Sequence, residues 1–139
     1  MNRPTNEVLG RLAFLVNTRG IIPDPIDATR INSSLIDVDG TTAILYTVPD
    51  GKRLFIDSFW VAVTNNAAGT SGVHLIIRDT SDVQVNRLFL LPIAGNAMNS
   101  ASQYICPAIE VTAGYDVCIK SDIANCKGHG GIFGWLESV

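Results

Sequence analysis

Short runs of apolar, β-branched and aromatic residues, separated by turn signals, make up most of the chain after Gly40. Many of these runs alternate apolar and polar positions, as half-buried strands do. We count about eight such strands, and no long amphipathic helix interrupts them. The pattern predicts an all-β fold, a single antiparallel β-sandwich that covers residues 42–139.

The strongest strand signals lie in residues 42–65, TAILYTVPDGKRLFIDSFWVAVTN. At its centre is a turn signal, because Pro49 fixes its own φ and Gly51 accepts a positive φ without steric cost. This chemistry is typical of a hairpin loop. We therefore predict that Ala43–Val48 and Arg53–Thr64 are antiparallel neighbours.

The second of these strands carries two apolar sets in opposite phases, namely Leu54 and Ile56, then Phe59, Val61 and Val63. A slip of one residue near Asp57 and Ser58 would place both sets on the same face, and a β-bulge produces such a slip. We therefore expect a long, bent and largely buried strand that forms the spine of the sandwich.

Small and polar residues predict loops at 65–72, 94–103 and 121–131. The remaining segments supply further strands, which we place at 73–78, 83–93, 104–106, 109–111, 115–120 and 132–139. The proline at 107 is expected to end the strand before it or to confine that strand to a sheet edge.

Residues 1–41 form a segment that is too apolar for a solvated tail and too irregular for a sheet. Helical spacing of apolar residues from Asn6 to Val16 fits a short helix, and Pro23 and Pro25 favour an extended chain. The segment either packs on its own domain or forms an arm that is buried on a neighbouring subunit after assembly. We expect an arm, whose candidate interaction residues are Val8, Leu9, Leu12, Phe14, Leu15, Ile21, Ile22 and Ile26.

The composition, 47% hydrophobic and 17% charged over 139 residues, fits one folded domain whose surface is poor in charge. The net charge is -3 without a cluster of Lys or Arg, so we expect no nucleic-acid partner. No apolar run is long enough for a membrane helix, and no signal peptide is evident, so we expect no membrane partner. Synthesis is then expected in a cytoplasm.

Three cysteines, Cys106, Cys118 and Cys126, do not make a closed disulfide framework, although a bridge between Cys106 and Cys126 remains open. Cys126 and His129 have the C-x-x-H spacing of half a zinc site, but no second pair of ligands follows. We expect no metal or cofactor.

Catalytic motifs are not evident either. The chain has no G-x-S-x-G and no His-x-His pair on a strand, and sequence alone cannot place Glu110 and Asp116 across a cleft. We therefore expect no enzyme and no catalytic residues. An enzyme of the cupin type is the minor alternative.

Three aromatic residues, Trp60, Phe133 and Trp135, fall on strand positions that can face out of the sandwich. They either fill a second apolar layer or cover the arm, or they remain exposed. An exposed platform would serve as an interface anchor, where Trp is enriched, or as a stacking surface for sugar.

Residues 46–52 with 54–56, residues 109–114 and residues 131–137 read YTVPDGK with LFI, IEVTAG and GIFGWLE. These segments resemble a jelly-roll β-sandwich found among tailed-phage structural proteins, which include head decoration (cement) proteins and fibre or baseplate modules. The resemblance implies a jelly-roll-like fold and a non-enzymatic, often trimeric virion component. It also implies that the N-terminal extension is tied to a neighbouring subunit.

We therefore expect a capsid decoration protein that stabilises the head shell through subunit contacts. Its expected partners are the major capsid protein and itself, as a homotrimer, on the capsid surface of a virion made in the host cytoplasm. The alternative is a tail fibre or baseplate adhesion module that binds host-surface glycan, through loops such as Asn65–Gly72 and Ala94–Gln103.

Overall fold

The fold is seen in a computed structural model, which describes residues 29–33 and 36–139. The candidate arm residues from Val8 to Ile26 lie outside the described residues. Nine strands follow in chain order: β1 (Thr29–Asn32), β2 (Ile36–Asp39), β3 (Thr42–Thr47), β4 (Lys52–Asn65), β5 (Ser71–Arg78), β6 (Gln84–Ile93), β7 (Ala97–Val111), β8 (Asp116–Ser121) and β9 (Cys126–Ser138).

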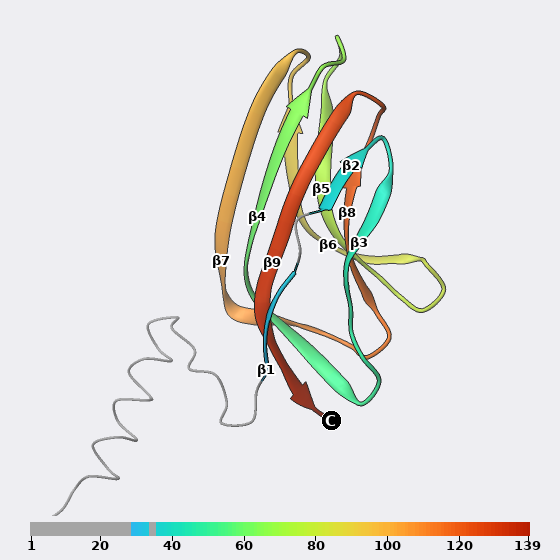
Figure 1. The fold of residues 1–139 in the computed structure, drawn as a ribbon, viewed down its shortest axis with the longest axis vertical. Coiled ribbons are helices and arrows are strands. Elements are labelled where there is room, and N and C mark those ends of the chain that lie inside the picture. The colour runs from blue at the N-terminus through green and yellow to red at the C-terminus, as the bar shows by residue number, and fades with distance from the viewer. Residues whose placement is uncertain (1–28, 34–35) are drawn as a thin grey trace, which may run out of the picture.

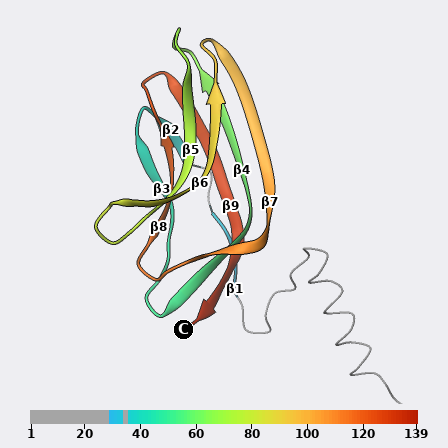
Figure 2. The same ribbon diagram turned by 180° about the vertical axis from the view of Figure 1, so that it is seen from behind.

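The strands form two antiparallel sheets that pack face to face (Figures 1 and 2). The first sheet has the order β1-β9-β4-β7, and β2 also pairs with β9. The second sheet has the order β3-β8-β5-β6. If β1 and β2 count as one interrupted strand, this order is that of an eight-stranded jelly roll. The predicted all-β sandwich is confirmed.

The core lies between the sheets and is built on β4. All the apolar residues of its two phases are buried on one face, with at most 2% of each exposed: Leu54, Ile56, Phe59, Val61 and Val63. The pairing of β4 with both β7 and β9 shifts between Ile56 and Ser58, which confirms the predicted bulge. One extra residue, Asp57, is enough to keep both sets on the core side.

The predicted hairpin between β3 and β4 is wrong, because the two strands lie in different sheets. The turn itself forms as expected, since Lys52 N donates to Pro49 O at 3.2 Å and Gly51 has a φ of 70°. It crosses from one sheet to the other instead of closing a hairpin. Both edges of β4 are already paired, with β9 and β7, so no edge remains for β3.

Two predicted loops are also corrected. Residues 97–103 belong to β7 and residues 126–131 belong to β9, although both stretches are rich in small or polar residues. Each stretch pairs with the C-terminal half of β4. At the end of that strand, Asn65 lies opposite both Ala97 and Cys126. The long partner strand imposes the extended conformation, which overrides weak local propensity.

Residues 29–32 and 36–39, which the sequence interpretation places in the arm, pair with β9 as β1 and β2. Ile31 and Val38 belong to the core cluster of this same chain. The sheet therefore starts earlier than residue 42 in the described part of the chain. Among the described residues, no helix has the length and apolarity needed to cross a membrane.

Candidate functional site

An aromatic layer covers the outer face of the first sheet, opposite the core. Side chains alternate along a strand, so the outward positions of β4 include Phe55 and Trp60, and those of β9 include Phe133 and Trp135. Phe55 lies opposite Trp135, and Ser58 lies opposite Phe133. The three candidate aromatic residues, Trp60, Phe133 and Trp135, all have outward positions on their strands.

One part of this layer is closed. The rings of Phe55 and Trp135 stack at 5.4 Å between centroids with 13° between their planes, and Arg53 Cζ lies 5.7 Å from the Phe55 centroid. Trp135 Nε1 also donates to Glu137 Oε1 at 2.9 Å. Only 4% of Trp135 is exposed, so the expectation that this ring is exposed is corrected. Contacts with Phe55 and Glu137 cover the Trp135 ring, and Arg53 covers the Phe55 ring.

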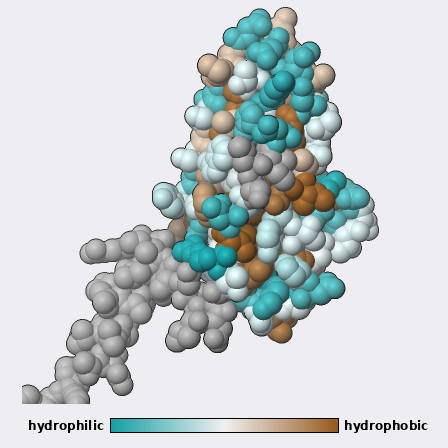
Figure 3. All heavy atoms as spheres, in the orientation of Figure 1, coloured by the Kyte–Doolittle hydropathy of each residue, from teal (hydrophilic) through white to brown (hydrophobic). Residues whose placement is uncertain are grey.

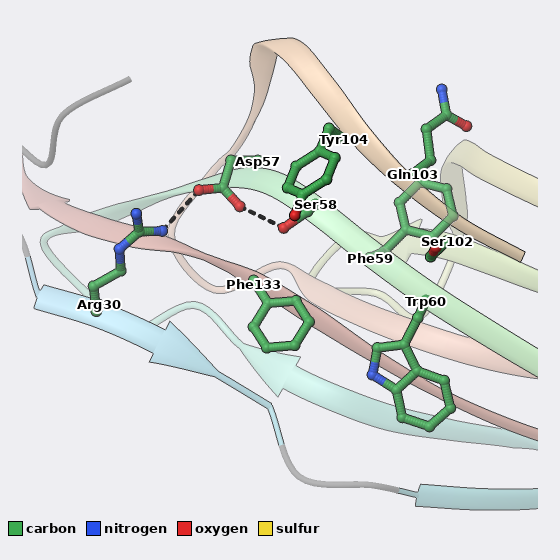
Figure 4. A pocket seen from close by; sticks show the side chains of 9 residues that line it. All are labelled: Arg30, Asp57, Ser58, Phe59, Trp60, Ser102, Gln103, Tyr104 and Phe133. Atoms are coloured by element: carbon green, nitrogen blue, oxygen red, sulfur yellow. Dashed lines mark hydrogen bonds and ion pairs between the residues drawn. The ribbon is translucent and has the colours of Figure 1, made fainter. Parts of the chain in front are cut away.

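The other part of the layer is open and forms a pocket of about 400 Å³ (Figure 4). The pocket is lined by Arg30, Asp57, Ser58, Phe59, Trp60, Ser102, Gln103, Tyr104 and Phe133. Tyr104 is 89% exposed, and Trp60 and Phe133 are half-buried. Rings from three neighbouring strands, β4, β7 and β9, thus meet at one opening.

A fixed polar group forms one wall of this pocket. Arg30 Nη1 on β1 lies 2.7 Å from Asp57 Oδ2, and Ser58 Oγ donates to Asp57 Oδ1 at 2.8 Å (Figure 4). Asp57 is the residue that the bulge leaves without a register partner on either side. Bulges turn a side chain away from the regular alternation, which explains how a carboxylate reaches the outer face here.

The structure thus brings together two of the three predicted aromatic residues, Trp60 and Phe133, and separates Trp135 from them. Sequence reasoning missed Arg30, Asp57 and Tyr104. The bulge at Asp57 was the one signal that could have pointed to the polar wall. Tyr104 carried no such signal, because its exposure depends on the place of β7 at the sheet edge.

Two histidines make short polar contacts elsewhere. His74 Nε2 lies 2.7 Å from Asp122 Oδ2, and His129 Nδ1 lies 2.6 Å from Asp37 Oδ1. In the C-x-x-H segment, Cys126 is buried in the core while His129 faces the outer side. Within residues 29–33 and 36–139, no three His, Cys, Asp or Glu side chains gather as ligands for one ion.

All three cysteines are free thiols, with Cys106 exposed on β7 and Cys118 and Cys126 buried. No bridge joins Cys106 to Cys126. Burial raises the pKa of the Cys118 thiol, although Arg78, whose Nε lies 3.2 Å from Cys118 Sγ, acts in the opposite direction. Cys118 is therefore held mainly as a thiol in the core, where it packs as a small apolar residue.

The free edge of the first sheet is a second surface of interest. Among the described strands, β7 pairs only with β4, and it runs along the outside of the sandwich in both ribbon views (Figures 1 and 2). Its 15 residues are mostly exposed, and none from Ala97 to Ile109 is charged. Hydrophobic side chains also reach the surface in the middle of the sandwich in the view of Figure 3.

Comparison with known proteins gives only distant likenesses. No family model matches the chain, and no curated protein matches its sequence. Among solved structures, a pentameric capsid protein isolated from metagenomic phage sequences shares 16% identity and a TM-score of 0.39, covering 100% of this chain and 94% of that one.

Two other solved structures with distant likeness come from different kinds of protein. The C-terminal family 22 carbohydrate binding module of Clostridium thermocellum Xyn10B shares 11% identity at a TM-score of 0.42, covering 80% of this chain and 81% of that one. The pili of Bacillus endospore appendages share 14% identity at a TM-score of 0.37, covering 81% and 88%. These likenesses assign neither a family nor an activity to this chain.

Proposed function

We propose that this protein is a non-catalytic structural component of a virion, a capsid decoration protein that acts by forming contacts between subunits. The observation that carries the proposal is the long edge of β7, which has no second partner among the described strands and no charged residue from Ala97 to Ile109. The segments that resemble structural proteins of tailed phages support the virion setting.

Residues 97–104 of β7 carry neither a charge nor a proline, two of the features that keep sheet edges from pairing with other chains. Natural proteins protect an edge by making it short, by placing charges on it or by covering it. In β7, Met98 is 79% exposed and Tyr104 is 89% exposed, and Glu110 is the first charged residue of the strand. Such an edge favours association with a second chain.

The neighbouring edge strand of the second sheet extends this surface. Within the described part of the chain, β6 pairs only with β5, and it contacts β7 on the same side of the sandwich. Leu90, in the half of β6 that leads into β7, is 39% exposed. Two adjoining edges with apolar side chains provide a broader interface than either strand alone.

The finer features of the role follow from the same proposal. Self-association through this side would give the homotrimer, and the major capsid protein would be the partner on the shell. Residues 1–28 would act as the arm, with the apolar positions between Val8 and Ile26 buried on a neighbouring subunit. At about 25 cal/mol per Å² of apolar surface, even a modest arm contact becomes substantial over many copies.

The test is the mass of the protein in solution, measured by sedimentation or light scattering. We expect the wild-type protein to have a multiple of the 14.9 kDa chain mass and Ser100→Lys to shift it to the monomer. Ser81→Lys, in the exposed turn between β5 and β6, adds the same charge away from β7 and should leave the mass unchanged. A wild-type protein that stays monomeric at high concentration would overturn the proposed interface.

The arm is tested separately, by deleting residues 1–28 and measuring binding to empty shells of the virus. This deletion keeps β1 and β2, whose Ile31 and Val38 belong to the core. We expect weaker shell binding by a correctly folded protein. Unchanged affinity would show that the arm has no role in attachment.

The adhesion module remains the second candidate function. It needs a ligand site rather than a subunit interface. The open part of the aromatic layer, with its exposed Tyr104, its half-buried Trp60 and Phe133 and its polar wall, is the observation that favours it.

A further inference from the structure

We propose that the open pocket on the outer face of the first sheet binds a neutral saccharide, with Trp60, Phe133 and Tyr104 as stacking rings and Asp57 with Arg30 as the polar contact. The pocket lies on a sheet face, whereas the proposed subunit role uses a strand edge, and the two share Tyr104 of β7. The pocket would serve the adhesion alternative directly.

The rings of Trp60, Phe133 and Tyr104 lie at a spacing that suits a flat ligand such as a sugar ring. In register, Ser58 lies between Phe133 on β9 and Tyr104 on β7, and Trp60 follows on the same face of β4. Two strand spacings span about 9.5 Å, which is the scale of one or two sugar rings. The apolar C–H faces of a sugar ring can lie against aromatic faces while its hydroxyls point to the rim.

The polar wall supplies a donor and an acceptor side by side. Asp57 accepts hydrogen bonds from Arg30 and from Ser58, one on each carboxylate oxygen, and each oxygen has a second lone pair. Arg30 is a fixed donor next to it. A hydroxyl group both donates and accepts, so adjacent hydroxyls of a sugar match this pair.

Charge favours a neutral ligand over an anionic one. Arg30 and Asp57 neutralise each other at 2.7 Å, and they are the two charged side chains among the described residues that line the pocket. The protein as a whole carries a net charge of -3. A phosphate-containing or sialylated ligand would therefore find no unbalanced positive charge at this site.

The indole of Trp60 is positioned before any ligand arrives. A Cβ at Gly131, opposite Trp60 on β9, would lie 2.7 Å from Trp60 Nε1, so the glycine leaves the space that the indole fills. The other nearby atoms are also those of the indole. Gly131→Ala would therefore displace the ring without a clash against backbone. The variant tests whether binding depends on the position of the indole, because the indole itself is still present.

The chain has two tryptophans, so matched variants report on each part of the aromatic layer. Trp135→Phe leaves Trp60 in the pocket as the sole fluorophore, and Trp60→Phe leaves Trp135 in the closed stack. A neutral-glycan array with the full chain is followed by titration with the best binder and with maltohexaose, cellohexaose and xylohexaose. We expect a saccharide to change the emission of Trp60 and to leave that of Trp135 unchanged.

Calorimetry then measures affinity for that saccharide. Trp60→Ala and Gly131→Ala should each weaken binding about tenfold or more, which corresponds to 1.4 kcal/mol. Asp57→Asn should weaken it as well, while Ser100→Lys should bind like the wild type whether or not the protein assembles. No binding to any neutral glycan, equal affinity of Trp60→Ala, or binding only to sialyllactose or a heparin hexasaccharide would overturn the proposal.

Discussion

The inner and outer faces of β4 show how one strand serves two purposes. On the inner face, Leu54, Ile56 and Phe59 are almost completely buried in the core. On the outer face, Phe55 and Trp60 are half-buried and take part in the aromatic layer. The inner face determines stability, whereas much of the outer face is available for recognition.

The bulge at Asp57 connects the two faces. It keeps the residues on both sides of it in phase with the core, and it leaves Asp57 outside the regular pairing. The same irregularity thus preserves the core and supplies the carboxylate of the pocket wall. A substitution that clashes with the backbone at the bulge should disturb both the core and the pocket. A substitution of one side chain should disturb only the face on which that side chain lies.

The largest expected effect is that of Gly134→Ala, on β9 opposite Ile56 beside the bulge. A Cβ at this position would lie 2.0 Å from the Phe55 carbonyl oxygen, which is a clash with backbone. We expect a loss of about 4 kcal/mol or more in the free energy of unfolding, measured by urea denaturation.

Gly131→Ala is the matched control, because its Cβ would meet only the indole of Trp60. It should cost less than about 1.5 kcal/mol. Similar losses for the two variants would show that the close approach of β9 to the bulge is not a constraint on the fold.

Ile56→Ala tests the inner face by itself. Ile56 is fully buried, and the truncation leaves a cavity between the sheets. We expect a loss of about 2–5 kcal/mol in the free energy of unfolding, with the cost set by how far the core collapses. Ile56→Val should cost about 0.5–1.5 kcal/mol. A loss below about 1 kcal/mol in the free energy of unfolding of Ile56→Ala would contradict a core centred on β4.

Sequence patterning was sufficient for the features that depend on β4 alone. The opposite phases of Leu54 and Phe59 required a bulge, and the structure has it between Ile56 and Ser58. By the same alternation, Trp60 has an outward position on β4. These features are local, since each follows from side-chain alternation within a single strand.

Features that depend on strand partners could not be predicted in this way. A turn at Pro49 and Gly51 indicates a reversal but not the sheet to which the next strand belongs. The small polar residues of β7 have weak strand propensity, and pairing with β4 makes them extended. The contact of Arg30 with Asp57 joins residues 27 positions apart, and it forms only because β1 pairs with β9.

The smallest effects on stability are expected on the outer face, and two variants divide it. Phe55→Ala removes the stack on Trp135 and the contact with Arg53, so we expect a loss of about 2 kcal/mol. Trp60→Ala removes a ring that is supported by the sheet but borders the pocket. We expect a loss of about 1 kcal/mol or less, because little of the core depends on it.

The two outer-face variants are compared by urea denaturation. If the free energy of unfolding of both falls with urea concentration at the same slope, a difference in midpoint reports on stability alone. Near-wild-type unfolding of Trp60→Ala, together with lost saccharide binding, would separate recognition from folding on this face. If Trp60→Ala unfolds as readily as Phe55→Ala, both rings belong to one structural layer. The distinction between its closed and open parts would then be withdrawn.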